Sequence, residues 1–335
     1  MKGQKKRMNN SKKKEIFLWV LDNIVWVILI AIIIIFCLTI KGFNQWNIYR
    51  NILYHSVFIG TLAIAEALCI ISREMDLSTE SVMALSAVIT AYLAGTSTDA
   101  SGLHLNGITT FGIILLIGIF IGVFNGFFIV KMKINSFIIT LAGYLIFRAL
   151  GLVVSRGHGI LNISKDIVMV ARTNIGPIPL MVIILFATYG LFYLFLTKTK
   201  FGRYIYFIGN NREASYNAGI RINKVLFIVF ILSGALSAIA GWLIAARING
   251  CSPSLGTGML FEAMAAVVIG GVSLQGGMGK LTGVFAGAIL LSSISTVIAI
   301  VGMNPFYTNI IRGGLIIFAV LLDSIVSKIR SSLIY

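Results

Sequence analysis

Long apolar segments separated by short polar ones make up most of this 335-residue chain. The segments are about 17 to 25 residues long, and they lack the polar–apolar alternation of barrel strands. About 20 apolar residues let a helix cross a bilayer while satisfying its own backbone groups. The pattern therefore predicts an all-α polytopic membrane protein of about ten transmembrane helices. The expected spans are 16–40, 52–71, 79–95, 108–130, 134–154, 178–197, 223–246, 259–275, 280–301 and 308–327.

These spans are expected to form one transmembrane domain, 16–327, between a basic tail, 1–15, and a short tail, 328–335. With a cytoplasmic N-terminus, ten spans return a cytoplasmic C-terminus. Nineteen Lys and Arg residues then lie inside and six outside, as the positive-inside rule predicts. The tail resembles the start of a signal peptide, but the apolar run after it is too long for one, so we expect a retained helix. Eight spans would also keep both ends inside.

Composition supports the membrane class. Hydrophobic residues make up 58% of the chain and charged ones 11%, and the mean hydropathy is +0.97. A net charge of +16 would suggest nucleic-acid binding in a soluble protein, but no aromatic-rich basic groove accompanies it. In a membrane protein the basic residues are explained by their position in cytoplasmic loops. The three cysteines, Cys37, Cys69 and Cys251, have neither metal-binding nor redox spacing.

Small residues suggest an inverted repeat. Two spans carry glycines four residues apart, namely Gly118, Gly122, Gly126, Gly283 and Gly287. The segments ALSAVI at 84–89 and AMAAVV at 263–268 are also alike. The paired spans run in opposite directions in this topology, which is the mark of an inverted repeat. Close helix packing, which small residues favour in any bundle, is the alternative.

A polar and basic island, GRYIYFIGNNREASYNAGIRINK at 202–224, stands between two apolar spans. The charge count places it in the cytoplasm, within a loop at 198–222. Asn210 and Asn211 suit a helix N-cap, and Gly219 suits a helix end. We expect a short cytoplasmic helix here that docks a soluble partner, with an ordinary amphipathic connector as the alternative.

Several segments, in order, resemble one transporter family. Glu213, Ala214 and Ser215, with Gly219 four residues later, resemble the EAA loop of ABC importer permeases. MDLSTESVMALSAV at 75–88 resembles the IDLSVGS segment of the ribose type, and the start of 135–157 resembles its PSFIxTLG segment. SPSLGTGMLFEAMAAVVIGGVSLQGGMGKLTG at 252–283 resembles a third. Over most of 52–325 the chain therefore resembles a carbohydrate-type (ribose, autoinducer-2 or rhamnose-like) ABC importer permease.

The resemblance implies a permease subunit in the bacterial plasma membrane that moves a sugar or sugar-like solute inward by ATP-driven alternating access. It implies three partners: a second permease chain, identical or different, an ATP-binding subunit, and an extracytoplasmic solute-binding protein. The outer segment 155–177 is a candidate landing site for the binding protein. The residues expected to couple to the ATPase are Asn210, Asn211, Arg212, Glu213, Ala214, Ser215 and Gly219.

No cofactor, metal or catalytic residue is expected on this chain, and ATP and Mg²⁺ would bind the partner ATPase. GGMGK at 276–280 resembles part of a phosphate-binding loop, but Leu274 and Leu281 occupy positions that need Gly and Ser or Thr. The energy source must then be another chain. The glycines there are expected to let a short turn pack closely.

Charged residues mark where the chain departs from the ribose type. Ser72-Arg73-Glu74 and Thr79-Glu80 replace small residues, and Asn135 replaces a Pro. Glu66 places a carboxylate inside a span, which costs about 2.5–3.5 kcal/mol on insertion scales unless it pairs or faces water. Asp76 or Ser78 can cap the span that follows, and Glu80 favours the positive end of that helix. These residues, Glu66, Asp76, Ser78, Glu80 and Asn135, are candidates for the translocation pathway or gate.

Three further charges, Arg148, Glu262 and Arg312, lie near the outer ends of spans. We expect Glu262 to pair with one of the two arginines.

Two other functional classes stay open. An ion-coupled secondary transporter of a small polar solute would use carboxylates such as Glu66. A membrane enzyme is disfavoured because His55, His104 and His158 have no metal or nucleophile spacing. The sequence does not name the solute, since selectivity in such systems is expected largely in the external binding protein.

Overall fold

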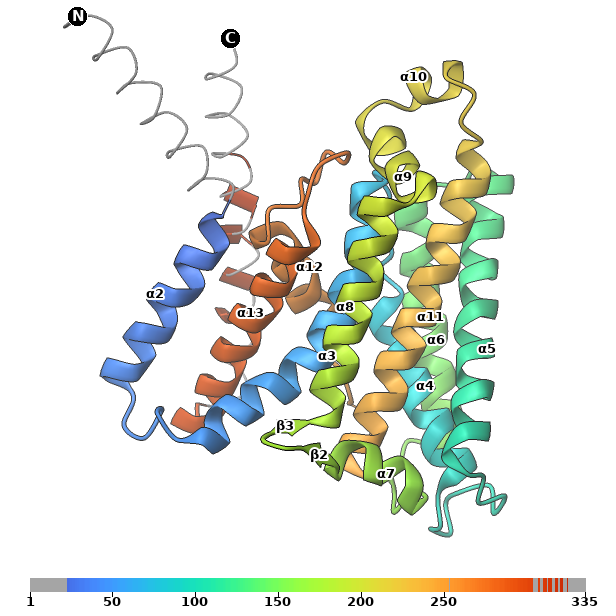
Figure 1. Ribbon diagram of the computed structural model, residues 1–335. Coiled ribbons are helices and arrows are strands. Elements are labelled where there is room, and N and C mark those ends of the chain that lie inside the picture. The colour runs from blue at the N-terminus through green and yellow to red at the C-terminus, as the bar shows by residue number, and fades with distance from the viewer. Residues whose placement is uncertain are drawn as a thin grey trace, which may run out of the picture.

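The computed structural model describes residues 23–252 and 254–303 and single positions from 307 to 324. Helices form most of it (Figure 1). They are α2 (Ile24–Thr39), α3 (Trp46–Ile71), α4 (Thr79–Ala94), α5 (Gly107–Gly126), the π-helix η1 (Phe127–Lys131), α6 (Ser136–Ser155), α7 (Lys165–Arg172), α8 (Leu180–Lys198), α9 (Lys200–Asn210), α10 (Arg212–Asn217), α11 (Ile222–Ile248), α12 (Met259–Ile269) and α13 (Leu281–Val301). Four two-residue strands, β1 (Ile160–Leu161), β2 (Asn174–Ile175), β3 (Ile178–Pro179) and β4 (Gly250–Cys251), form the pairs β1–β4 and β2–β3.

The described helices agree with a polytopic membrane protein. Six segments are long and apolar enough to cross a bilayer: α3, α5 with η1, α6, α8, α11 and α13. α2, α4 and α12 are apolar but shorter. At 1.5 Å per residue, the 16 residues of α4 span only about 24 Å. The start of the first expected span and most of the tenth lie outside the described residues, so the total of ten stays a prediction.

Two expected spans differ at their ends from the helices observed. α12 ends at Ile269 and not near 275. Gly270 caps it and Gly271, at a φ of +85°, turns the chain away, although apolar residues continue beyond it. α3 begins at Trp46, six residues before the expected start at 52.

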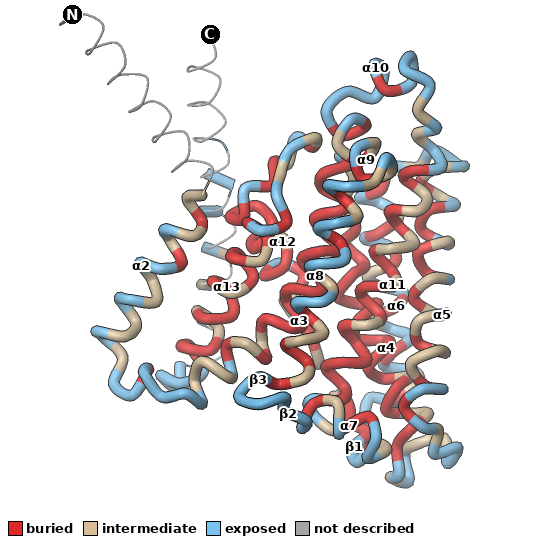
Figure 2. Tube along the Cα trace, viewed as in Figure 1, coloured by how far each residue is buried: buried red, intermediate tan, exposed pale blue. Residues whose placement is uncertain are grey.

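α3 lies at the centre of the bundle. Of the 18 consecutive residues that make up its most apolar part, 94% are buried, whereas the corresponding share in α6 is 22%. α8, α11, α12 and α13 all pack against α3, and the burial map shows this interior (Figure 2). α6 turns large apolar side chains such as Leu145 and Val153 outward, as a lipid-facing helix would. The bundle therefore has an interior helix and a lipid-facing rim.

The glycine-spaced faces lie in close helix contacts. A Cβ on Gly118 would lie 2.5 Å from Ala238 on α11, and one on Gly122 would lie 2.6 Å from Ile231. A Cβ on Gly126 would meet the Phe227 ring at 3.0 Å. Thus α5 lies against α11 along its glycine face, as small residues permit.

α13 uses its glycines against a different helix. Gly283 and Gly287 lie against the backbones of Gly270 and Ala266, at the end of α12. α5 ends and α13 begins at the end of the molecule that carries α9 and α10 (Figure 1), so the two run in opposite directions. Because their glycine faces meet non-equivalent helices, α11 and α12, the inverted repeat stays a prediction.

Candidate functional site

The polar island folds as two short helices at one end of the molecule (Figure 1). α10 covers Arg212–Asn217, and Asn211 caps it by accepting a 2.9 Å hydrogen bond from the Ala214 amide. Gly219 follows at a φ of +78°. The helix expected within the island is therefore present, with one difference. Asn210 is the last residue of α9 and does not cap α10.

α9 was not expected from the sequence. Thr199 caps it through a 2.9 Å hydrogen bond from the Gly202 amide. It turns Ile205 and Ile208 inward and leaves Phe207 exposed. The island is thus an amphipathic helix followed by an exposed one, because its apolar residues recur at helical spacing among basic ones.

A close backbone junction joins α9 to the rest of the chain. The Gly277 amide donates a 2.8 Å hydrogen bond to the Ile71 carbonyl at the end of α3. A Cβ on Gly209 would overlap that carbonyl, and one on Gly277 would lie 2.6 Å from the Asn210 backbone. Tyr206 donates a 3.0 Å hydrogen bond to the Gly279 carbonyl. The glycines of 276–280 therefore let three segments touch backbone to backbone.

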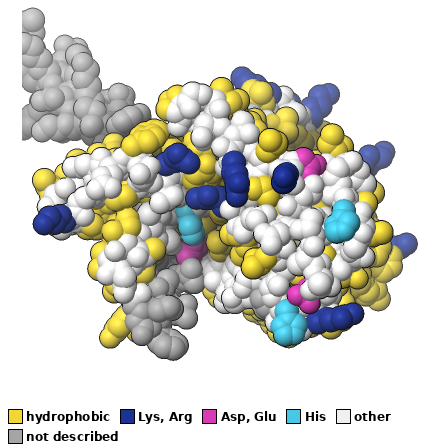
Figure 3. All heavy atoms as spheres, turned by 90° about the horizontal axis from the view of Figure 1, so that it is seen from below, with side chains coloured by type: hydrophobic (Ala, Val, Ile, Leu, Met, Phe, Trp, Pro, Cys, Tyr) yellow, Lys and Arg dark blue, Asp and Glu magenta, His cyan; other side chains and the backbone are white. Residues whose placement is uncertain are grey.

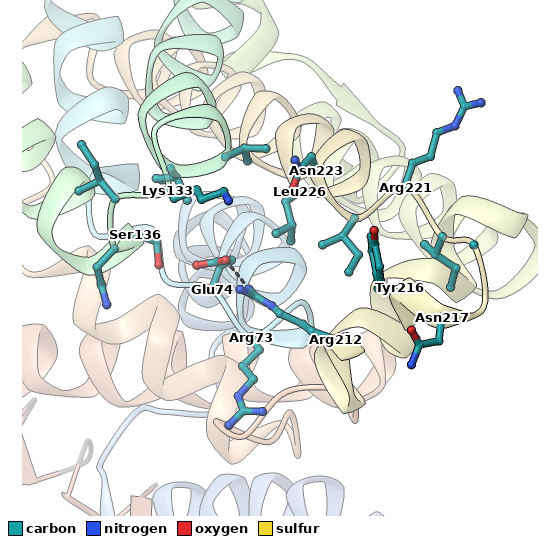
Figure 4. A pocket seen from close by; sticks show the side chains of 17 residues that line it. Arg73, Glu74, Lys133, Ser136, Arg212, Tyr216, Asn217, Arg221, Asn223 and Leu226 are labelled. Carbon is teal, nitrogen blue, oxygen red and sulfur yellow. Dashed lines mark hydrogen bonds and ion pairs between the residues drawn. The ribbon is translucent and has the colours of Figure 1, made fainter. Parts of the chain in front are cut away.

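An ion pair joins α10 to the α3–α4 turn. Arg212 contacts Glu74 across a groove of about 1180 Å³ (Figure 4). Lys133 points into the same space, whereas Arg221 points away from it. Asn135 also lines this groove and caps α6 by accepting from the Phe137 amide at 2.9 Å. Asn135 therefore lies at the α10 end and is separate from the four other gate candidates.

Those four residues, Glu66, Asp76, Ser78 and Glu80, are all at most 2% exposed. Asp76 accepts hydrogen bonds of 2.6 Å from both Ser78 and Ser233, and Asn125 donates to Ser78 at 2.9 Å. Ser233 lies eleven residues into α11, roughly 16 Å along that helix. The cluster is therefore deep in the bundle and draws on α3, α4, α5, α11 and the turn before α4.

Capping of α4 by these side chains is not observed. Ser78 occupies the N-cap position but makes no side-chain capping bond. Its hydroxyl and amide both donate to Asp76, the amide at 3.0 Å. The carboxylate of Asp76 thus orders the turn before α4 and ties it to α11.

Glu66 and Glu80, the two glutamates among these four residues, each have a hydrogen-bond partner in another helix. Thr79 donates a 2.7 Å hydrogen bond to Glu66 on α3. Glu80 accepts from the amides of Gly258 and Leu260 at 3.0 and 3.1 Å. Glu80 therefore satisfies the start of α12, where a carboxylate is favoured by the exposed amides and the helix dipole. From the sequence, Glu80 was expected to favour the positive end of its own helix, α4.

Arg148 is paired with Glu80, at 3.9 Å, and not with Glu262. Its guanidinium also donates to the Leu255 carbonyl at 2.7 Å and to Thr257 at 2.6 Å. Glu262 is 2% exposed and accepts a 3.1 Å hydrogen bond from Ser295. Arg312 lies outside the described residues, so a Glu262–Arg312 pair stays a prediction.

A second cavity, of about 450 Å³, lies between α3, α11, α12 and α13. None of the candidate site residues is among its described lining. Asn51 and His55 do line it, four residues apart on one face of α3, as do Ser295 and Thr296 on α13. That spacing, and the hydroxyl run within a long apolar span, are the only signals in the sequence that pointed to this cavity.

Comparisons with known proteins bear on these features. The family described as "Branched-chain amino acid transport system / permease component" matches residues 48–320. The chain is 29% identical over 314 residues to the ribose import permease protein RbsC of Escherichia coli K12, covering 91% of this chain and 94% of that one. It is 32% identical over 304 residues to the RbsC protein of Bacillus subtilis 168, covering 88% and 89%.

A third relative is the L-arabinose transport system permease protein AraH of Escherichia coli K12, 32% identical over 279 residues, which cover 81% of this chain and 80% of that one. No solved structure matches the chain significantly. The family match covers most of the chain, and the relatives align over nearly their full length. The chain therefore belongs to this family of permease components of transport systems, as a multi-pass membrane protein.

Proposed function

We propose that this chain is the membrane-spanning subunit of a bacterial ABC importer and that it moves a small sugar across the plasma membrane, driven by ATP hydrolysis on a partner chain. The sugar class is supported by the relatives, whose names specify ribose, xylose and L-arabinose. The partners are an ATP-binding subunit, a second permease chain and an extracytoplasmic solute-binding protein.

The observation that carries this proposal is the exposed position of α10. All of its residues except Ser215 are exposed, and Tyr216 is 73% exposed. Exposed aromatic residues are enriched among those that dominate protein interfaces. Basic residues expected in the cytoplasm, among them Lys133 and Arg212, extend into the groove at the same end. An ATPase subunit would dock here.

Movement of α10 would reach the membrane helices by two routes. The Arg212–Glu74 pair leads to the turn that contains Asp76. The Gly209–Gly277 contact leads to the end of α3 and to the loop between α12 and α13. Because α3 is the interior helix, displacement of its end would change the packing around it. Alternating access would follow from this coupling.

Uptake by the complete complex in proteoliposomes tests the proposal. The solute-binding protein and labelled sugar are placed outside, with ATP and Mg²⁺ inside and no ion gradient. The panel holds ribose, xylose, L-arabinose, rhamnose and autoinducer-2, with leucine added because the family description names amino acids. We expect ATP-dependent uptake of one sugar that ionophores leave intact. Uptake that ignores ATP and follows a proton or sodium gradient would establish the ion-coupled alternative.

Charge reversal at Glu213 tests the docking helix directly. Glu213→Arg places a cation at the start of α10, facing solvent. We expect the variant to fold and to lose co-purification with the ATPase subunit. Lys165→Glu, a charge reversal at another exposed position, on α7, is the matched control and should retain the ATPase. Normal ATPase retention by Glu213→Arg would count against docking at α10.

A further inference from the structure

Four residues from three parts of the chain meet at one polar contact, here called the clasp. Glu80 lies in the first turn of α4, Arg148 lies on α6, and Leu255 and Thr257 lie in the turn before α12. Arg148 is twelve residues into α6, roughly 18 Å along that helix. Because α6 begins at the α10 end, the clasp lies beyond the middle of α6, toward the opposite end of the molecule.

On one side of the clasp, Glu80 is fixed to the start of α12. The side chain is 1% exposed and accepts from the Gly258 and Leu260 amides at 3.0 and 3.1 Å. Leu260 is buried, and an amide at a buried helix start needs a partner. To withdraw Glu80 would leave these amides without that partner, which is costly. α4 and the start of α12 are therefore expected to move together.

On the other side of the clasp, Arg148 is held by contacts that are easier to replace. Its guanidinium donates to the Leu255 carbonyl at 2.7 Å and to the Thr257 hydroxyl at 2.6 Å, and it lies 3.9 Å from Glu80. The Arg148 side chain is 18% exposed, and Thr257 is exposed. An arginine within a span faces water or protein rather than lipid, so water can take over the hydrogen bonds that it leaves. The clasp would therefore part at Arg148 and not at Glu80.

The packing of α6 leaves room for such a movement. Among the described helices, α6 packs mainly against α4. A Cβ on Gly151 would lie 3.8 Å from the nearest atoms of α4, and one on Gly143 would lie 3.4 Å from Ser78. On α5, by contrast, a Cβ on Gly118 would lie 2.5 Å from Ala238 of α11. α6 is thus less tightly fitted to its neighbour than α5 is.

We propose that the clasp is a latch, which holds α6 to the turn before α12 in the resting transporter and opens at Arg148 in each transport cycle. The inference rests on the proposed function and adds to it a movement of α6 and the contact that controls this movement. Hydrogen bonds weaken steeply with distance and angle, so a small displacement of α6 is enough to open the latch.

A reversible cross-link across the clasp tests whether it opens. In a Cys37→Ser background, where Cys69 and Cys251 are buried, Arg148→Cys with Thr257→Cys places one thiol on each side. The partner chains are cysteine-free, and a short bifunctional thiosulfonate joins the two thiols. We expect the double variant to take up sugar before the reagent is added, to lose uptake about tenfold when cross-linked, and to recover it with reductant. The ATPase subunit should be retained throughout.

Thr96→Cys with Asn162→Cys is the matched control. The Thr96 hydroxyl donates to the Asn162 carbonyl at 2.8 Å, and both residues are exposed. They lie in the connections at the end opposite α10, where Lys, Arg and His side chains reach the surface (Figure 3). This cross-link should leave uptake unchanged. Full uptake by the cross-linked clasp variant would show that the clasp stays closed during transport, and equal inhibition of the control pair would show that the effect is not specific. Either result would overturn the latch.

Glu80→Gln tests the latch with Arg148 in place, and it decides the matter if the double cysteine variant does not fold. Gln keeps an oxygen that accepts from an α12 amide and removes the charge beside Arg148. We expect ATP hydrolysis without sugar to rise about threefold, because α6 leaves its resting position more readily, while ATPase co-purification stays normal. A purely structural contact would lower the yield or the unfolding midpoint without raising this hydrolysis.

Glu262→Gln is the control for the loss of a buried charge. Glu262 lies on α12, is 2% exposed and is not part of the clasp, so its variant should leave hydrolysis without sugar unchanged. The same rate in Glu80→Gln as in the unmodified complex would reject the latch and leave the importer assignment intact. Uptake by the unmodified complex that did not depend on ATP would instead reject the importer assignment.

Discussion

The two ends of the molecule are built in opposite ways. At the α10 end, backbones touch at Gly209 and Gly277, and an ion pair crosses the adjoining groove. At the other end, the connections carry two-residue strands and the short helix α7, and a cavity opens between the helices. At the α10 end three segments touch backbone to backbone beside a groove of about 1180 Å³, whereas the other end holds a smaller cavity, of about 450 Å³, between its helices.

This difference suggests a division of labour along α3. Packed backbones transmit displacement because they have no room to absorb it, so the α10 end suits transmission of ATPase movement. The first turns of α3 line the cavity, and its last residue lies in the glycine junction. One helix thus runs from the junction beside the proposed docking site to the cavity at the other end.

The sharpest way to break this comparison is to add one carbon at the junction. Gly209→Ala would place a Cβ on the Ile71 carbonyl, and overpacking of this kind costs about 1–3 kcal/mol. Because α9 must move away from α3, we expect uptake to fall by more than tenfold. The thermal unfolding midpoint of the purified chain and the uptake rate of the complex measure the two effects.

Gly190→Ala is the matched control. Gly190 also lies within a helix, α8, and nothing lies within 4 Å of a Cβ built there. It should leave uptake unchanged and keep or raise stability, by up to roughly 1 kcal/mol, from the higher helix propensity of alanine. If the two variants had the same unfolding midpoint and the same uptake rate, the contact between Gly209 and Ile71 would not be tight in the membrane-embedded protein.

The ion pair at the same end should have a smaller effect. Arg212→Glu places a second carboxylate beside that of Glu74, and the two repel each other. We expect the number of sugar molecules moved per ATP hydrolysed to fall about fivefold while the ATPase still binds. The cost in stability should stay below about 1 kcal/mol, because the Arg212 side chain is 44% exposed. The exchange Glu74→Arg with Arg212→Glu should recover most of the coupling. Failure of the exchange to recover it would assign the loss to Arg212 alone.

The sequence predicted the long helices well and the short ones less well. α5, α11 and α13 arise from long apolar runs, which leave a helix as the only stable form in a bilayer. α9 was not predicted because its mixture of basic and aromatic residues resembles a polar loop. Its apolar face becomes visible only when the residues are spaced at about 100° each around a helix axis. The end of α12 escaped because Val272 and Leu274 extend the apolar run beyond the glycines that stop the helix.

The cavity could not be predicted because its polar residues come together only in the fold. Asn51 and Ser295 are 244 positions apart; Asn51 lies just before one expected apolar span, and Ser295 lies in a short group of hydroxyl residues within another. The glycines at 276–280 were expected to pack a short turn, but only the structure gives their partners, Ile71 and Asn210.

The charged departures from the ribose type show what a single residue can and cannot reveal. Glu66 and Thr79 are separate oddities in the sequence but are hydrogen-bonded partners at 2.7 Å in the fold. Glu80 likewise joins Arg148 and the start of α12. A buried carboxylate without a partner is costly, so these substitutions make physical sense as a set. Their role in a gate stays a hypothesis.

The smallest expected effect belongs to the open end, at Asp166 on α7. Partial burial acts to raise the pKa of its carboxyl. Hydrogen bonds from the Ser164 hydroxyl and the amides of Gly107 and Ile167 outweigh burial, so the pKa lies below its ordinary value. A lowered pKa in the folded state means that these bonds stabilise the fold fully above the unfolded pKa, about 3.9, and that this stabilisation is lost as pH falls through the folded pKa.

The unfolding midpoint of the purified chain should therefore drop more between pH 5 and pH 3 than that of Asp166→Asn, with Ser164→Ala in between. Because Asp166 is exposed and screened by solvent, the difference should be a few degrees at most. If Asp166→Asn also abolished sugar uptake at neutral pH, α7 would be a part of the transport path, and the contrast between a tightly coupled end and a loosely held one would be wrong.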